Sequence, residues 1–427
     1  MRLLLINLFL FISILSYTQP KGLSYFLVQA KDNSPLINKT KDANELVSIN
    51  IKQIKSILTK PQINLEANLL FAPIISHDNG NNKFQFVSDG NVTNYTGYDL
   101  AFSNGGQYQA FASITQPLLN RNRYKAYSQK AEISTKININ TINLTIHELE
   151  QVISYQYIIC LRYKKQKEIN NELINSLKEP VEIMQKLVEN AIYQQTDLIL
   201  LNIELKNYQI LLKKYTSQYT NSLADLQILC GINDTSINDI KNIQLKIKNN
   251  TILNSEFLAK YTLDSLNILA EQNVFNQKYK PKLNLFANIG MNAIYQPSFN
   301  RLGALAGVNF KLNIFDGNQK KIQNDKTIIK IKTLEFEKQN FINRYNINKT
   351  KYLIQIESIK QRVDIINTQI LQYKNLIKQY KIKLSQGQAS IMDIKLLIRD
   401  LSSKKQELIN LQTEKQILIN NYNYWNF

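Results

Sequence analysis

The chain has 427 residues, enough for more than one domain, and a formal net charge of +19. A basic excess of this size would suit nucleic acid, but the lysines are scattered along predicted helices and form no basic block, which excludes nucleic acid as a partner. The two cysteines and two histidines lack metal-ligand spacing. Because the sequence also holds no phosphate loop and no catalytic signature, we expect a non-enzyme without cofactor or metal.

The N-terminal segment 1–18 has the pattern of a signal peptide. Arg2 gives a positive start, residues 3–15 form an apolar core, and small residues at 16–18 supply a cleavage site. A transmembrane anchor is the alternative, but the apolar run is too short to span a bilayer comfortably. We therefore predict export.

The rest of the chain is an internal duplication. The segment 60–65 (KPQINL) returns as 280–285 (KPKLNL), an offset of 220 in residue number. Asp197 and Asp393 differ by 196 in residue number, as do other matched positions of the helical parts. The larger offset means that the first half is longer, and its extra length falls in a loop, where insertions cost little stability. This pattern predicts two similar halves, each with a strand pair and a helix pair.

The first repeat is predicted over residues 19–231. It starts with a helix over about 24–60 that is broken or capped near Ser34. Period-two alternation predicts strands near 62–72 and 107–118. A long helical hairpin follows over 121–229, with a kink or local break at Pro180 and a stop at Gly231.

The second repeat is predicted over residues 258–427, after a polar connector at 232–257. It contains a helix, strands near 282–292 and 305–315, and a helical hairpin over 320–423. Helices of about 65 residues are roughly 100 Å long and must pack lengthwise on each other.

Each predicted strand has one apolar and one polar face. Four such strands cannot close into a barrel, yet an open sheet edge in lipid is costly, so several chains must pool their strands. The polar faces would then line a water-filled lumen. Five residues are predicted to face it: Asn64, Glu66, Asn284, Asn309 and Lys311.

The two cysteines leave two alternatives open. Cys160 and Cys230 are equidistant from the turn of the first helical hairpin, so they would lie at similar height on straight antiparallel helices. A disulfide is then conceivable in an oxidising compartment. Two small apolar core residues are the alternative that we favour.

Several fragments in order resemble those of TolC-type outer-membrane efflux proteins. They lie at residues 30–36, 60–65, 116–119, 223–231, 314–317 and 386–393. The resemblance implies a mainly α-helical homotrimer with a twelve-stranded β-barrel in the lipid of the cell outer membrane, continued by a periplasmic α-helical barrel with an equatorial layer near residues 232–257. It implies a passive exit duct that works with a periplasmic adaptor and an inner-membrane pump. A non-channel envelope coiled-coil scaffold or adhesin is the alternative.

The resemblance also implies a gate at the periplasmic helix tips. It places the constriction aspartate at Asp393 and the equivalent tip residue at Asp197. Without the resemblance, an exposed aspartate stabilised by its helix dipole is an equal alternative for Asp393. This sequence departs from the family at Leu396, where a second acidic ring is expected, and at Ala389, where a basic residue is expected. The tip turns are expected to dock the adaptor through seven residues: Ala191, Tyr193, Gln194, Gly387, Gln388, Ala389 and Ser390.

Overall fold

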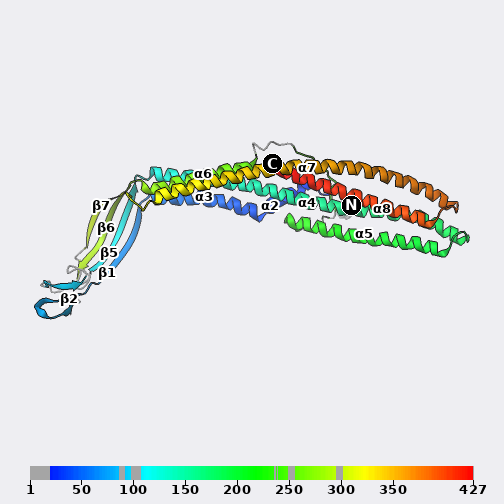
Figure 1. Ribbon diagram of the computed structural model, residues 1–427. Coiled ribbons are helices and arrows are strands. Elements are labelled where there is room, and N and C mark those ends of the chain that lie inside the picture. Colours follow the sequence, from blue (N-terminus) through cyan, green and yellow to red (C-terminus); the bar gives the residue numbers. More distant parts are fainter. Residues whose placement is uncertain are drawn as a thin grey trace, which may run out of the picture. The chain divides into compact units, whose positions relative to one another are not determined.

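Figure 1 shows the computed structural model, which describes residues 20–85, 92–97, 107–234, 237, 239–248, 255–294 and 302–426. The predicted signal peptide lies outside these ranges. The chain divides into two compact units: the first comprises Met1–Lys41, Ile139–Tyr261 and Phe336–Phe427, and the second comprises Asp42–Asn138 and Thr262–Glu335. Among the described residues, no helix combines the length and apolar character needed to cross a membrane.

The second unit contains a four-stranded antiparallel sheet in the order β1-β5-β6-β7 (Figure 1). Its strands are β1 (Gln62–Leu70), β5 (Gln107–Leu118), β6 (Lys282–Ile294) and β7 (Leu302–Lys311). The predicted strand pairs are the hairpins β1·β5 and β6·β7, and β5·β6 joins the two halves. The sheet is open in the described part of the chain, with β1 and β7 as its edges.

The register keeps like side chains on one face across the whole sheet. Leu65 pairs with Ala112, which pairs with Ile289 on β6. Two of these apolar residues lie open to solvent, with Leu65 84% exposed and Ile289 57% exposed. An isolated chain therefore carries a continuous uncovered apolar sheet face, which is unfavourable in water.

Strand β7 differs from the prediction at its C-terminal end. The alternation predicted a strand near 305–315, but β7 ends at Lys311. Residues Leu312 and Ile314 continue the apolar alternation and are 44% and 91% exposed. Within the described sheet of one chain these residues have no neighbouring strand. They therefore show the strand pattern in sequence but form no ladder of backbone hydrogen bonds.

The long loop of the first half contains structure that the sequence pattern did not reveal. Three short strands form a second sheet in the order β3-β2-β4: β2 (Ile74–Ser76), β3 (Lys83–Gln85) and β4 (Tyr95–Gly97). The Asp78 carboxylate holds this region by accepting hydrogen bonds from the Thr93 hydroxyl at 2.7 Å and the Asn94 amide at 3.0 Å. The Thr93 hydrogen bonds lower the pKa of Asp78.

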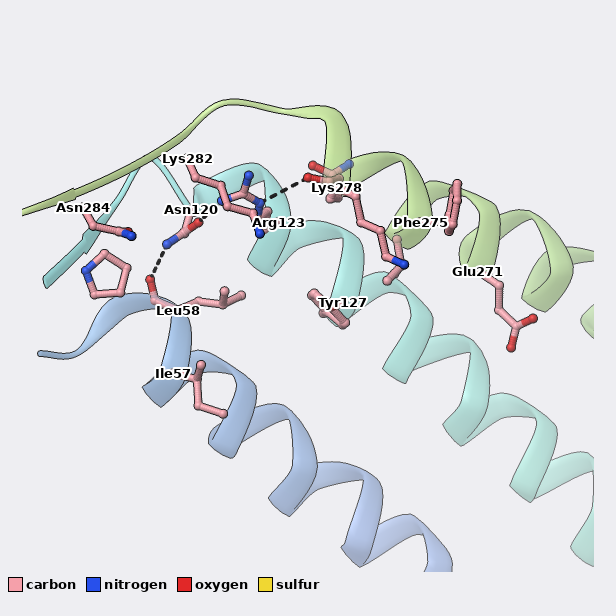
Figure 2. A pocket seen from close by; sticks show the side chains of 13 residues that line it. Ile57, Leu58, Asn120, Arg123, Tyr127, Glu271, Phe275, Lys278, Lys282 and Asn284 are labelled. Atoms are coloured by element: carbon pink, nitrogen blue, oxygen red, sulfur yellow. Dashed lines mark hydrogen bonds between the residues drawn. The ribbon is translucent and has the colours of Figure 1, made fainter. Parts of the chain in front are cut away.

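Polar clamps fix the helices of the second unit to the start of α4 (Figure 2). Asn120 donates to the carbonyl of Leu58 at 3.0 Å, near the end of α3 (Pro35–Thr59). Arg123, only 8% exposed, donates to the carbonyls of Gln277 at 3.3 Å and Lys280 at 2.7 Å, just beyond α6 (Glu256–Asn276). A guanidinium suits this place because carbonyls at a helix C-terminus carry partial negative charge.

The first unit is built from long helices. They include α2 (Leu23–Asn33), α5 (Gln195–Leu229) and α8 (Ile391–Trp425), together with the C-terminal parts of α4 (Arg121–Glu189) and α7 (Gln319–Ser385). Helix α4 continues through Pro180, so the structure does not show a local break there. Leu177 and Met184 on either side are fully buried, and this packing offsets the hydrogen bond that the proline removes.

Two apolar clusters form the core of the first unit. One includes Leu384, Ile394 and Leu201 near the helix tips, and the other surrounds Tyr157 and Phe26. The Tyr157 hydroxyl donates to the Lys241 carbonyl at 2.6 Å, which ties the polar connector to α4. Burial raises the pKa of Tyr157.

Both cysteines lie in this second cluster as buried free thiols, which supports the core interpretation over the disulfide. The Cys160 thiol donates to the Ser222 carbonyl at 3.1 Å. Burial raises the pKa of Cys160 and of Cys230 to about 12.

We predict that the folded protein is inert toward a thiol reagent at neutral pH and that two thiols per chain react after denaturation. A buried thiol with a raised pKa presents little thiolate. A count made without reductant checks this, and absence of reactive thiol in the denatured chain would reveal a disulfide instead.

Candidate functional site at the helical tips

The two helical turns of the first unit have the same backbone conformation. Ala191 and Gly387, at equivalent positions of the two repeats, follow α4 and α7 and adopt left-handed conformations with φ of 54° and 69°. In each turn the next amide donates to a carbonyl five residues earlier, at 2.9 Å in the first turn and 2.8 Å in the second. Both helices thus end in a Schellman motif. The two repeats therefore share the backbone hydrogen bonds of their turns as well as their sequence pattern.

The two turns contact each other. The Tyr193 hydroxyl donates to the Ala389 carbonyl at 2.6 Å, and Ala389 is buried. A methyl group of Ile192 lies 3.4 Å from the position that a Cβ on Gly387 would take. The Tyr193 hydrogen bond therefore joins the tips of the two hairpins, and Ile192 lies close to Gly387.

The two predicted gate carboxylates occupy equivalent positions with different surroundings. Asp197 forms a capping box at the start of α5, accepting from the Gln194 amide at 3.4 Å. Helix α8 is capped by Ser390, whose hydroxyl accepts from the Met392 amide at 3.2 Å. Asp393 lies exposed in the first turn of α8. Asp197 therefore has a local structural role that Asp393 does not share.

Two turns further from the tip, polar groups link α5 to α8. The Glu204 carboxylate, with its side chain 12% exposed, lies 3.9 Å from the Lys395 ammonium. Tyr208 is buried beside it and hydrogen-bonded to Ser402, and burial raises the pKa of Tyr208. We call Glu204, Tyr208, Lys395 and Ser402 the α5–α8 link.

The sequence analysis missed the α5–α8 link, although a signal was present. Glu204 follows Asp197 by seven residues, and Asp400 follows Asp393 by the same interval. Carboxylates seven apart lie on one helix face. The departure from the family at Leu396 holds in the structure, where Leu396 is 47% exposed and Arg399 pairs with Asp400 at 3.7 Å.

Ion pairs also hold α4 against α7 and α8. Glu179 lies 2.7 Å from Lys381, and Glu172 lies 2.5 Å from Lys405. The four side chains border a cavity of about 700 Å³ between these helices. Ion pairs with an exposed carboxylate, as here, contribute little to stability.

The five residues predicted to face a lumen share one face of the sheet in the second unit. They are Asn64, Glu66, Asn284, Asn309 and Lys311, with Asn284 paired to Asn309. Glu66 accepts from the Ser113 hydroxyl at 3.1 Å. Their role as lumen residues stays a prediction.

A duplicated strand hairpin and helical hairpin, closed by matched tips, defines a distinctive class of fold. The chain shares it with solved channels and outer-membrane proteins. The match with CusC covers 96% of this chain and 95% of that one at 11% identity, with a TM-score of 0.71. The match with the Campylobacter jejuni CmeC channel covers 94% and 85% at 13% identity with a TM-score of 0.68, and that with Vibrio cholerae VceC covers 95% and 96% at 12% identity with a TM-score of 0.69.

The resemblance indicated by the sequence is therefore confirmed for the fold. Comparison with protein-family models gave no match, and comparison with curated proteins gave none. CusC and CmeC are channel proteins. The described part of this chain is mainly helical, with an open four-stranded sheet.

We predict that Ala191→Gly stabilises the first tip and that Gly387→Ala destabilises the second. A left-handed residue other than glycine costs about 1 kcal/mol, so hydrogen exchange of the amide after each turn should slow by roughly fivefold in the first variant and quicken in the second. The variants are matched controls for each other, and a shift in the same direction would contradict the prediction.

Proposed function

We propose that this chain is one subunit of an outer-membrane channel that forms the exit duct of an efflux or secretion system. The observation that carries the proposal is the sheet of the second unit: one face is apolar and uncovered, and both edges are open. The fold shared with outer-membrane channels supports a place in lipid for such a sheet. The export signal predicted for residues 1–18 agrees with this destination.

Lipid accounts for the apolar face. Residues such as Leu65, Val308 and Phe310 are 84%, 60% and 63% exposed, and burying apolar surface contributes about 25 cal/mol per Å². An open edge in the bilayer leaves amide and carbonyl groups unpaired, at several kcal/mol each. Four strands cannot close, so subunits must share a barrel; three chains supply about twelve strands, whereas two supply about eight, the lower limit.

The helical hairpins then extend into the periplasm as the wall of the duct. Their tips are the surface that we propose meets a periplasmic adaptor, and through it an inner-membrane pump that supplies the energy. The residues of this tip surface that we propose contact the adaptor include Tyr193, Gln194, Gln388 and Ser390. The duct itself is passive, and residues 232–257 form an equatorial layer.

Gating follows from the chemistry of the tips. In a trimer, three Asp393 carboxylates would form an acidic ring that favours cations and repels anions. To open, the tip must separate α5 from α8, which breaks the contact of Glu204 with Lys395. The α5–α8 link thus stabilises the closed arrangement.

A coiled-coil scaffold or adhesin is the competing function, but it gives no reason for an uncovered apolar sheet face. Purified protein should migrate differently in gel electrophoresis with and without heating, and should conduct ions in planar bilayers. A protein that does neither is not a channel.

We predict that Asp393→Ala raises single-channel conductance or weakens block by divalent cations. Removing the carboxylate removes a charge from the narrowest ring while Ser390 still caps α8. Asp364→Ala on the exposed face of α7 is the control and should behave as the wild type. Unchanged conductance and block in the Asp393 variant would remove this residue from the gate.

We also predict that Glu204→Gln favours the open channel. Removing one partner of a mostly buried ion pair costs about 1 kcal/mol in the closed state, which changes the closed-to-open ratio roughly fivefold. Glu407→Gln is the control, because Glu407 pairs with Lys404 at 3.1 Å within α8. Equal effects of both substitutions on open probability would argue against the α5–α8 link as a gate.

A further inference from the structure

We propose that β7 of one subunit pairs with β1 of a second copy of this chain in one register, in which Lys311 lies opposite the partner's Glu66. The inference rests on the proposed function, because it states how the subunits of the barrel join. It concerns only the open edges of the sheet in the second unit.

The residue offsets of the sequence repeat also relate the paired residues of the two strand hairpins. Gln62 pairs with Thr115 in the first hairpin, and Lys282 pairs with Lys311 in the second. Gln62 and Lys282 differ by 220 in residue number, the offset of the repeated KPQINL and KPKLNL segments. Thr115 and Lys311 differ by 196, the offset of the helical parts. The two hairpins are therefore copies in register as well as in pattern.

The β5·β6 joint is a template for the joint between chains. It brings the last strand of one hairpin against the first strand of the next, as β7 would meet the partner's β1. In the chain, Thr115 pairs with Phe286. Moving each residue by its repeat offset gives Lys311 opposite the partner's Glu66.

The transferred register keeps both faces of the sheet intact. The template pair Ser113–Asn288 becomes Asn309 opposite the partner's Asn68, both on the polar face. The next position places Phe310 opposite the partner's Ala67 on the apolar face. A slip of one residue would put apolar groups on the polar face.

Charge gives a second and separate reason. Lys311 lies directly opposite Lys282 within the chain, and like charges at opposed positions destabilise a sheet. The partner's Glu66 would flank Lys311 on its other side and neutralise one of the two charges. Both Glu66 and Lys311 are exposed in the isolated chain. The neutral Thr115–Phe286 pair at the internal joint shows that the charged pair belongs only to the joint between chains.

The early end of β7 has the same explanation. The β5 residues Gln116–Leu118 extend beyond the β1·β5 ladder and pair only with β6. Their counterparts, residues 312–314, can pair only with the partner's β1, at residues 63–65. These residues have a strand pattern but no partner within the described sheet of one chain.

The first test is oxidative cross-linking of the full chain in outer-membrane preparations. Asn68→Cys/Asn309→Cys should give a covalent multimer, because directly opposed strand residues lie within disulfide reach. Asn64→Cys/Asn309→Cys is the matched control, displaced by about 13 Å along the strand, and should give none. The single variant Asn309→Cys measures any contribution of the buried native thiols.

The second test uses charge. Glu66→Lys should lower the temperature at which the oligomer dissociates in detergent, because three like charges then lie side by side. Adding Lys311→Glu should restore most of the loss. A double variant no more stable than Glu66→Lys overturns the proposed ion pair.

The outcomes also separate this inference from the proposed function. An oligomer that conducts ions but cross-links through positions 64 and 309, or through neither pair, overturns the register and leaves the channel. A chain that stays monomeric and does not conduct overturns both.

Discussion

The constraint that governs this protein is the pairing of backbone amide and carbonyl groups at the two edges of its sheet. In water those groups can bond to solvent, but in a bilayer they have no such partner. A chain whose sheet ends at β1 on one side and β7 on the other is incomplete in lipid. The sharing of a barrel between subunits, which we propose, follows from this requirement, and the uncovered apolar face fits the same lipid surroundings.

The duplication shows how one chain can meet that requirement with two kinds of joint. Within the chain, the start of α4 uses Arg123 to hold the carbonyls beyond α6. The equivalent residue of the second repeat is Gln319, which has no charge and lacks the paired hydrogen-bond donors of a guanidinium. At the same level, Asp316 accepts from the Tyr279 hydroxyl, which raises the pKa of Tyr279 to about 12. In the oligomer that we propose, the internal joint therefore has the stronger clamp, and the joints between chains depend more on strand pairing.

Much of the fold could be predicted because it depends on local patterns. Alternation located the strands, and Gly231 and the tip turns located helix ends to within a few residues. The end of β7 could not be predicted in that way, since a strand exists only where a neighbour completes its ladder. In the assembly that we propose, a partner strand completes this pattern, whereas the structure describes one chain. Pro180 continued its helix because tertiary packing outweighed local preference, and the small β2–β4 sheet depends on Asp78 binding residues about fifteen positions away.

The candidate gate shows how duplicated positions can diverge in chemistry while keeping their geometry. Both tips end in left-handed residues and both following helices carry an aspartate at the third position. In the first copy that carboxylate is engaged with the Gln194 amide, so its charge serves the helix start. In the second copy Ser390 provides the cap, and the Asp393 carboxylate is left exposed. The two tips thus keep the same backbone conformation with different capping residues, glutamine in the first and serine in the second, and the exposed Asp393 carboxylate is the one that we propose acts on ions.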